Sequence, residues 1–181
     1  KIPDYRGANV LQWAIANGET EAGVTWHLMD EKVDHGQILK QGTVPVLEED
    51  TAIEVFDRIC KKGLELFHQL WDEAGRNGVL PYDVDMTAGH CWKCRTPLDG
   101  IIWPKMTERD IRNLLRAQCP PWPAPILVHE GTVFRVHGIA CEHRDGVLEY
   151  DSGSRKILLD VSRETDRELI QKTLERVVAS T

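Results

Sequence analysis

The sequence lacks any apolar run long enough to cross a lipid bilayer, and it contains no signal-peptide pattern. It is also poor in positive charge. Its 22 Lys and Arg residues stand against 29 Asp and Glu residues, which gives a formal net charge of -7 and a pI near 5.5. A chain with this balance is poorly suited to gripping a polyanion over a wide surface. These absences argue against a membrane protein and against a general nucleic-acid binder.

Cysteine is present, but without the pattern of a disulfide scaffold. The five cysteines are an odd number scattered through the chain, which suits a reducing cytoplasm and predicts a cytoplasmic location. Cys91 and Cys94 have C-x-x-C spacing, and structural zinc needs four cysteine or histidine ligands. No second C-x-x-C follows this pair, and the isolated residues after it include Cys119, His137, Cys141 and His143. We therefore predict no metal site.

The apolar content is sufficient for a core. In a chain of 181 residues, 41% hydrophobic residues can build one ordinary domain or two small ones. The polar segment from Pro81 to His90 contains Pro, Gly and several acidic residues, and such connectors are typical of domain boundaries. We therefore predict two domains, residues 1–82 and 83–181.

The stretch from Gly23 to Leu39 carries the candidate catalytic residues. Its first part alternates as a strand does, with two faces: Val24, Trp26 and Leu28 on one, Thr25, His27 and Met29 on the other. An acidic loop follows and ends at Gly36, where the chain can turn without a Cβ penalty. A strand histidine and a loop carboxylate seven residues later can fold back to face each other, so His27 and Asp34 are a candidate acid/base pair. The alternative is a surface histidine and a turn-forming aspartate.

Helical patterns flank this stretch. Residues 8–17 have apolar residues at helical spacing before the stop signal Asn17-Gly18. The sequence Thr51-Ala52-Ile53-Glu54 has the form of a capping box and opens the clearest helix, which ends near Gly75. Its apolar stripe predicts core residues that pack over a sheet: Ile53, Phe56, Ile59, Cys60, Leu64, Phe67, Leu70 and Trp71.

The last third of the chain has the pattern of a small β domain. Thr107 caps a predicted helix with Ile111, Leu114 and Leu115 on its apolar face. Short strands with Gly-containing turns then follow, and they are predicted at 125–129, 132–141, 146–150 and 156–161. Such strands suit a small barrel. A final helix over 165–178 has one apolar face, formed by Leu169, Ile170, Leu174, Val177 and Val178.

Two sets of residues resemble the formyltransferase family that uses 10-formyltetrahydrofolate. The first match is continuous from Pro3 to Gln41 and includes Tyr5-Arg6-Gly7, Trp13-Ala14, Gly18-Glu19, Gly23-Val24-Thr25, His27, Asp34 and Gly36. The second includes Arg95-Thr96-Pro97-Leu98-Asp99-Gly100 and Pro120-Pro121-Trp122-Pro123, and it is similar to the linker and the start of the C-terminal domain, especially in enzymes that formylate nucleotide-linked amino sugars. The resemblance implies an α/β fold: the C-terminal part of a Rossmann-like formyltransferase domain, followed by a small OB-like β-barrel domain.

The resemblance also implies roles for individual residues. In the family an Asp works with an Asn and a His, and the matching segment for those two would lie before Lys1. Seven residues receive roles by this resemblance: catalysis for Asp34 and His27, contact with the folate for Gly36, Val33 and Met29, and contact with the substrate for Tyr5 and Arg6. The alternative for Arg6 is a loop anchor tied to a carboxylate such as Glu19.

The implied activity is transfer of a formyl group from 10-formyltetrahydrofolate to a primary amine. His27 is shared with glycinamide-ribonucleotide and amino-sugar enzymes, so a nucleotide-linked amino sugar is the first choice of acceptor. Methionyl-tRNA formyltransferases typically have an apolar residue at this position, and the acidic balance also disfavours tRNA. The open alternatives are a methionyl-tRNA formyltransferase, a 10-formyltetrahydrofolate hydrolase and a non-catalytic fragment or binding module. A Rossmann-like sheet without its first strands exposes an apolar face, which predicts a covering piece or a homodimer.

Overall fold

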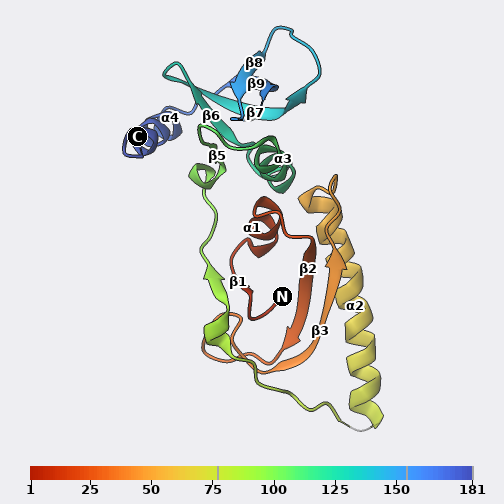
Figure 1. Cartoon of the computed structure of the whole chain (residues 1–181). Coiled ribbons are helices and arrows are strands. Elements are labelled where there is room, and N and C mark those ends of the chain that lie inside the picture. The colour runs from red at the N-terminus through yellow and green to blue at the C-terminus, as the bar shows by residue number, and fades with distance from the viewer. Residues whose placement is uncertain (77, 154, 181) are drawn as a thin grey trace. The chain divides into compact units, whose positions relative to one another are not determined.

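A computed structural model describes residues 1–76, 78–153 and 155–180 (Figure 1). The chain divides into two compact units, Lys1–Cys94 and Arg95–Thr181. Residues 83–94 therefore belong to the first of these units. Among the described residues, no helix combines the length and the apolar character needed to cross a membrane.

The first unit is built on an antiparallel strand pair with a long helix beside it (Figure 1). Strand β2 (Glu21–His27) pairs with β3 (Ile38–Pro45), and helix α2 (Ala52–Arg76) packs on both strands. The side chains of β2 alternate as predicted. The indole nitrogen of Trp26 donates to the Gly63 carbonyl of α2 at 2.9 Å, whereas Thr25 and His27 line a cavity. The alternation in the sequence thus gives β2 a helix-covered face and a cavity face.

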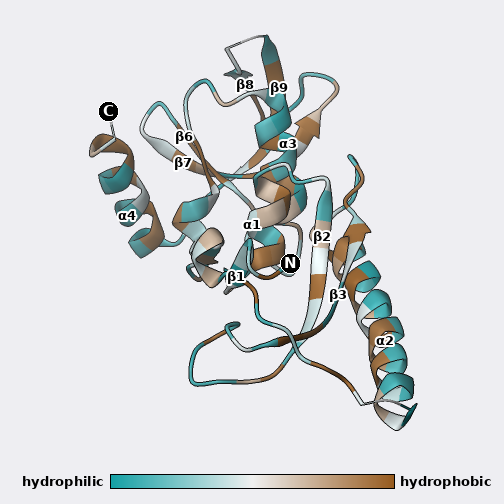
Figure 2. Cartoon of the chain, turned by 60° about the horizontal axis from the view of Figure 1, so that its bottom comes forward, coloured by the Kyte–Doolittle hydropathy of each residue, from teal (hydrophilic) through white to brown (hydrophobic). Residues whose placement is uncertain are grey.

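Helix α2 begins where the capping signal predicts, because the Glu54 carboxylate accepts from the Thr51 amide at 2.7 Å. The predicted core face is wrong for most of its members. The residues of α2 that are buried are Ala52, Val55, Gly63, Leu66 and Leu70. Six of the eight predicted core residues are instead exposed: Ile53, Phe56, Cys60, Leu64, Phe67 and Trp71. Figure 2 shows brown and teal bands alternating along this helix. The small residues at the buried face let α2 approach the strands closely, and the large residues beside them remain at the surface.

A second strand pair joins the beginning of the first unit to its end. Strand β1 (Tyr5–Gly7) runs parallel to β4 (His90–Trp92), which follows the short 3-10 helix η1 (Met86–Ala88). The Trp92 ring stacks on Tyr5 and on Trp13, with ring centroids 5.3 and 4.8 Å apart. The sequence did not predict this pairing, since both strands are three residues long.

Helix α1 (Val10–Ala16) lies within the predicted range 8–17. It begins after Asn9, which has a positive φ of 54°, and it ends at Asn17 before Gly18 (φ 77°). Two of its apolar residues, Ala14 and Ile15, are buried. The helix thereby places Val10 and Leu11 against the same cavity that β2 lines.

The second unit contains one five-stranded sheet. The strands follow the order β5 (Ile101–Ile102), β6 (Ile126–His129), β7 (Thr132–Ala140), β9 (Lys156–Arg163) and β8 (Val147–Asp151). The parallel pair is β5 with β6, and the other neighbours are antiparallel. All four predicted strands are present within two residues at each end. Within the part of the chain that the structure describes, β5 and β8 are not paired with each other, so the sheet has two edges.

Two helices complete the second unit, after the 3-10 turn η2 (Pro97–Gly100). Helix α3 (Glu108–Ala117) is capped by Thr107 as predicted, and α4 (Arg167–Val178) is capped by the Asp166 carboxylate. The buried residues Ile101, Ile126 and Val133 form a core cluster. The partly buried side chains of α4 that pack on this cluster are Leu169, Ile170, Leu174 and Val177. Val178 was predicted on the same face but is 75% exposed.

Candidate active site

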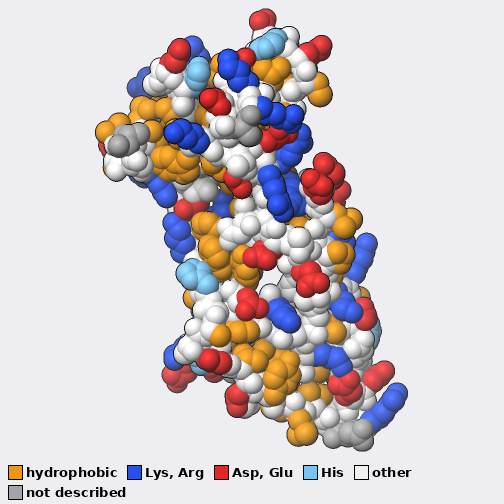
Figure 3. Space-filling model, in the orientation of Figure 1, with side chains coloured by type: hydrophobic (Ala, Val, Ile, Leu, Met, Phe, Trp, Pro, Cys, Tyr) orange, Lys and Arg blue, Asp and Glu red, His pale blue; other side chains and the backbone are white. Residues whose placement is uncertain are grey.

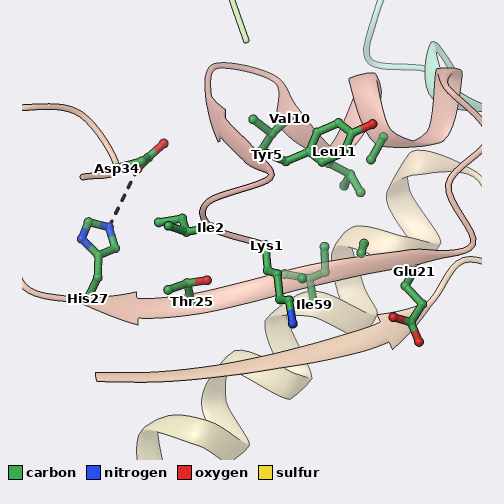
Figure 4. A pocket seen from close by; sticks show the side chains of 13 residues that line it. Lys1, Ile2, Tyr5, Val10, Leu11, Glu21, Thr25, His27, Asp34 and Ile59 are labelled. Carbon is green, nitrogen blue, oxygen red and sulfur yellow. Dashed lines mark ion pairs between the residues drawn. The ribbon is translucent and has the colours of Figure 1, made fainter. Parts of the chain in front are cut away.

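A cavity of about 190 Å³ lies in the first unit, between β2 and the segment that carries β1 and α1 (Figure 4). Its lining includes Ile2, Tyr5, Leu11, Thr25, His27 and Asp34. The apolar side chains come from the N-terminal segment, α1, β2 and α2, and His27 and Asp34 lie at one end of the cavity. Figure 4 shows His27 at the end of β2 and Asp34 on the following loop, turned toward each other.

The structure brings His27 and Asp34 together, as the sequence predicted. The Nε2 atom of His27 lies 3.9 Å from Oδ1 of Asp34, and both side chains are partly exposed. The Nδ1 atom of His27 is 2.8 Å from the Leu28 carbonyl oxygen. Because a carbonyl can only accept, Nδ1 carries the proton of the neutral ring. The basic nitrogen is then Nε2, which faces the carboxylate across the rim of the cavity.

Asp34 is fixed from the other side by a backbone amide. The Gly7 N–H donates to Oδ2 of Asp34 at 2.8 Å, so the two carboxylate oxygens have different partners. Gly7 itself has a φ of 94°, and a Cβ there would lie 2.3 Å from the Trp92 carbonyl oxygen. Only glycine fits this position. The β1–β4 pairing therefore sets the amide that orients Asp34.

The loop between β2 and β3 supplies three residues predicted to contact a folate. Gly36 is buried, and a Cβ there would lie 1.8 Å from the Leu28 carbonyl oxygen. The close approach of these two backbone segments thus accounts for the glycine. Met29 is 92% exposed and Val33 is 72% exposed. Contact of these residues with a folate stays a prediction.

Tyr5 and Arg6 have different surroundings. The Tyr5 ring lines the cavity, and its hydroxyl donates to the Glu19 carboxylate at 3.0 Å. Partial burial, together with the nearby Glu19 carboxylate, raises the pKa of Tyr5, although a bond from Asn17 opposes this. The Arg6 guanidinium donates to the Met86 carbonyl at 2.9 Å. The carboxylate expected to anchor Arg6 therefore binds Tyr5 instead, and Arg6 holds η1 against β1.

The C-x-x-C pair lies on and beside β4. Cys91 and Cys94 are both exposed, and the Cys94 thiol is 3.3 Å from Oδ1 of Asn9. Among residues 1–76, 78–153 and 155–180, no group of three or more His, Cys, Asp or Glu side chains is arranged to hold a metal ion.

Sequence reasoning missed Gly7 and Trp92 as parts of the site. Gly7 belongs to the Tyr-Arg-Gly segment, which drew attention only through its side chains. Trp92 contributes through its backbone carbonyl, which fixes the conformation of Gly7. No local pattern in the sequence indicates that residues 90–92 return to residues 5–7.

Comparison with known proteins gives this geometry a context. Residues 2–70 match the sequence family described as formyl transferase. GDP-perosamine N-formyltransferase of Brucella melitensis is 32% identical over 139 residues, which cover 76% of this chain and 53% of that protein. Methionyl-tRNA formyltransferase of Pelotomaculum thermopropionicum is 32% identical over 145 residues, which cover 80% of this chain and 46% of that protein. The chain therefore spans about half the length of these curated relatives.

A solved structure shares the fold. The N-formyltransferase of Helicobacter canadensis, in complex with folinic acid and dTDP-3-aminofucose, superposes with a TM-score of 0.69 at 19% identity. The match covers 88% of this chain and 62% of that one. At this identity the likeness establishes the α/β formyltransferase fold and nothing finer.

Proposed function

We propose that the chain transfers a formyl group from 10-formyltetrahydrofolate to a primary amine, because its residues 2–70 match the formyl transferase family. The observation that carries this proposal is the arrangement of Asp34, whose carboxylate is held by the Gly7 amide and faces His27 at the rim of a cavity. This arrangement supplies a proton acceptor and a fixed negative charge at one point. Formyl transfer needs both.

The reaction requires an unprotonated amine to attack the formyl carbon of the donor. The tetrahedral intermediate carries an oxyanion and a protonated nitrogen, so a proton must leave the nitrogen before the intermediate collapses. When it does, the C–N bond to the folate breaks, the formyl group stays on the acceptor, and the folate nitrogen takes up a proton.

In this scheme His27 and Asp34 act as a pair. The Nε2 atom of His27 is the basic nitrogen of the ring and receives the proton, directly or through one water. The Asp34 carboxylate, 3.9 Å away, stabilises the imidazolium that results. The imidazolium beside the developing oxyanion stabilises the transition state more than the ground state.

The size of the cavity bears on how the donor binds. A volume of about 190 Å³ is below the range of roughly 300–1,000 Å³ that encloses a drug-sized ligand. We propose that the cavity takes the amine and the formyl end of the donor, and that the folate rings lie along the loop that carries Met29, Val33 and Gly36. The exposure of Met29 and Val33 leaves both side chains available for that contact.

A nucleotide-linked amino sugar is the acceptor we propose. The name of the Brucella relative and the dTDP-3-aminofucose in the Helicobacter complex support this choice. The Tyr5 ring on the cavity wall offers an apolar face for a sugar, and contact of the next residue, Arg6, with the substrate is part of the proposal. His27 also supports this choice, because the resemblance shares this histidine with the amino-sugar enzymes of the family.

Methionyl-tRNA is the second candidate, since a relative of equal identity carries that name. Charge argues against it. Residues 1–94 hold 9 of the 22 basic residues and 16 of the 29 acidic residues, so the whole net charge of -7 lies in the unit with the cavity. A tRNA acceptor stem would have to approach that unit against its charge. A hydrolase that uses water as the acceptor is a further alternative.

The larger architecture is also part of the proposal. We assign residues 1–82 to the second half of a formyltransferase domain and residues 83–181 to a linker and an OB-like domain. The five-stranded sheet with its capping helices supports the second assignment. A homodimer is proposed as one way to cover the exposed face of α2.

The proposal is tested by following the donor spectroscopically. The protein is incubated with 10-formyltetrahydrofolate and, separately, with dTDP- and GDP-linked amino sugars, with charged initiator tRNA, or with water alone. We expect tetrahydrofolate to form with an amino sugar nucleotide and the formylated sugar to appear by mass spectrometry. Equal donor consumption in every arm identifies a hydrolase, and no consumption in any arm overturns the enzymatic proposal.

A further inference from the structure

The loop between β2 and β3 presents Asp34, and a side-chain bridge crosses this loop. We propose that Asp30 and His35 are positioning residues, whose bridge closes the loop and holds the Asp34 carboxylate against the Gly7 amide. This inference rests on the proposed function only in treating Asp34 as the catalytic carboxylate. Neither Asp30 nor His35 lines the cavity, so both act through Asp34.

The bridge consists of two hydrogen bonds to one carboxylate. Oδ1 of Asp30 accepts from the Lys32 backbone amide at 2.8 Å, and Oδ2 is 2.7 Å from Nδ1 of His35. The bond from His35, followed by that from Lys32, lowers the pKa of Asp30, so the carboxylate is ionised and Nδ1 of His35 is the donor. Residues 31–34 lie inside the ring that these bonds close.

The base of the same loop is fixed by the backbone. The Leu28 amide donates to the Gln37 carbonyl at 2.8 Å, and Gly36 is in close contact with the Leu28 carbonyl. The two ends of the loop are therefore set by the strands. The bridge between Asp30 and His35 adds a second constraint on this loop, next to the proposed catalytic residue Asp34.

The backbone of Asp34 explains why such a tie matters. Asp34 has a φ of 51°, in the left-handed region that L-residues other than Asn and Asp rarely occupy. A loop that relaxes toward negative φ turns the carboxylate away from both the Gly7 amide and Nε2 of His27. The bridge opposes this relaxation. Its side chains are about one-third exposed or more, so it contributes little to global stability and its effect is local.

The test uses NMR on the full chain and needs no substrate. Two signals report the position of Asp34: the chemical shift of the Gly7 amide proton, and the rate at which that proton exchanges with solvent. The reference variant is Asp34→Asn, which weakens the charge-assisted bond to Gly7 and removes the charge beside His27. We expect an upfield shift of the Gly7 amide proton and a faster exchange of this proton with solvent.

The decisive variants are His35→Ala and His35→Gln. His35→Ala removes the donor to Asp30, so both signals should move in the direction that Asp34→Asn moves them. In the His35→Gln variant the glutamine side-chain amide can still donate to Asp30, so both signals should stay at their wild-type values. The matched control is His143→Ala, an exposed histidine of the second unit, which should leave both signals unchanged.

Two results overturn the inference: His35→Ala with both signals at wild-type values, or His35→Gln with the signals of His35→Ala. If His35→Ala fails to fold, Asp30→Ala removes the acceptor of the same bond, and an unmoved Gly7 amide signal in that variant equally overturns the inference. In the formyl-transfer assay we expect kcat to fall about tenfold for His35→Ala with KM little changed, less than the roughly hundredfold that a 1 Å misplacement can cause. If the NMR signals change as expected but the wild-type protein shows no turnover, the proposed function is contradicted, while the positioning role of the Asp30–His35 bridge is supported.

Discussion

The two units differ in how well each one buries its own apolar residues. Of the 13 large hydrophobic residues that are exposed among the described residues, 12 lie in residues 1–94, and Val178 is the exception. Hydrophobic side chains also form several orange patches on the face of the first unit in Figure 3. In the second unit α3 packs on β7 and α4 packs on the core cluster of the sheet, whereas the first unit leaves one side of α2 open. The unit with the candidate active site thus leaves more of its large apolar side chains exposed than the second unit does.

Charge follows the same division. Residues 95–181 hold 13 basic and 13 acidic residues, so the second unit is neutral, while the first carries the whole net charge of -7. In the second unit many charges are used structurally. Glu164 pairs with Arg135, and Glu108 pairs with both Arg112 and Arg155. Charged side chains of the second unit thus pair with one another, and the distinctive features of the first unit are the loop that carries Asp34 and the exposed face of α2.

The largest expected effect lies at the loop. Asp34→Asn keeps the size of the side chain but removes the charge that stabilises a protonated His27. We expect formyl transfer to fall by about 10²–10⁴-fold, which is the usual contribution of a positioned acid/base group. Stopped-flow or steady-state measurement of tetrahydrofolate release checks this. Thermal unfolding that is unchanged from wild type separates a chemical role from a structural one, and undiminished turnover would show that Asp34 has no catalytic role.

The next effect concerns the two faces of α2. Leu66 is 4% exposed and Leu64 is 58% exposed, and they are of one residue type on one helix. We expect Leu66→Ala to lower the free energy of unfolding by about 2–5 kcal/mol. Leu64→Ala should change it by less than about 0.5 kcal/mol while reducing the binding of a hydrophobic dye. Chemical denaturation of the matched pair measures both. Equal losses of unfolding free energy in the two variants would mean that Leu64 is covered in solution and that the first unit buries more apolar surface than its exposed side chains indicate.

A smaller effect distinguishes the charges of the second unit. Burial opposes ionisation of Glu164, but the amides of Asp166 and Thr165 and the Arg135 guanidinium together lower its pKa below the usual value. The stabilisation is therefore fully present above the unfolded pKa, near 4.3, and is lost as the pH falls through the lower folded value. We expect Glu164→Gln to cost about 1–3 kcal/mol at pH 7. The difference from wild type should shrink at acidic pH, and a constant difference between pH 7 and pH 2 contradicts the assignment.

The smallest effect is at a helix cap. The Thr107 hydroxyl accepts from the Asp110 amide at 3.2 Å, while its own amide donates to the Asp110 carboxylate. Thr107→Ala should lower the free energy of unfolding by about 1 kcal/mol, and Thr107→Ser should be close to wild type. Urea unfolding of the three proteins checks this. A loss for Thr107→Ser as large as that for Thr107→Ala would indicate that the methyl group, rather than the cap, stabilises α3.

Much of the fold could be predicted from local signals. The capping residues Thr51 and Thr107 mark the starts of α2 and α3, and period-two alternation identifies β2 and the strands of the second unit. The pairing of His27 with Asp34 also follows from the sequence, because a strand and the loop directly after it must lie close together. These features depend on residues that are near one another in the chain.

Two failures have physical causes. On α2 the predicted core face is rotated by about one residue, or roughly 100°, because the largest apolar residues were taken as the buried ones. The strands pack instead on the side that carries Gly63 and Ala52, where there is room for their side chains. The β1–β4 pairing was missed because it joins strands of three residues that are far apart in sequence, and such contacts leave no periodic signal.

The parallel pairing of Gly7 with Trp92 has a consequence for how the protein is made. During synthesis the Gly7 amide cannot adopt its final orientation until β4 has left the ribosome, because the Trp92 carbonyl completes its surroundings. The hairpin of β2 and β3, which needs only nearby residues, can form much earlier. A nascent chain that is arrested before residue 92 should therefore contain the hairpin with its carboxylate loop still unanchored. Asp34 and His27 therefore reach their final geometry late in translation, after β4 of the first unit has been synthesised.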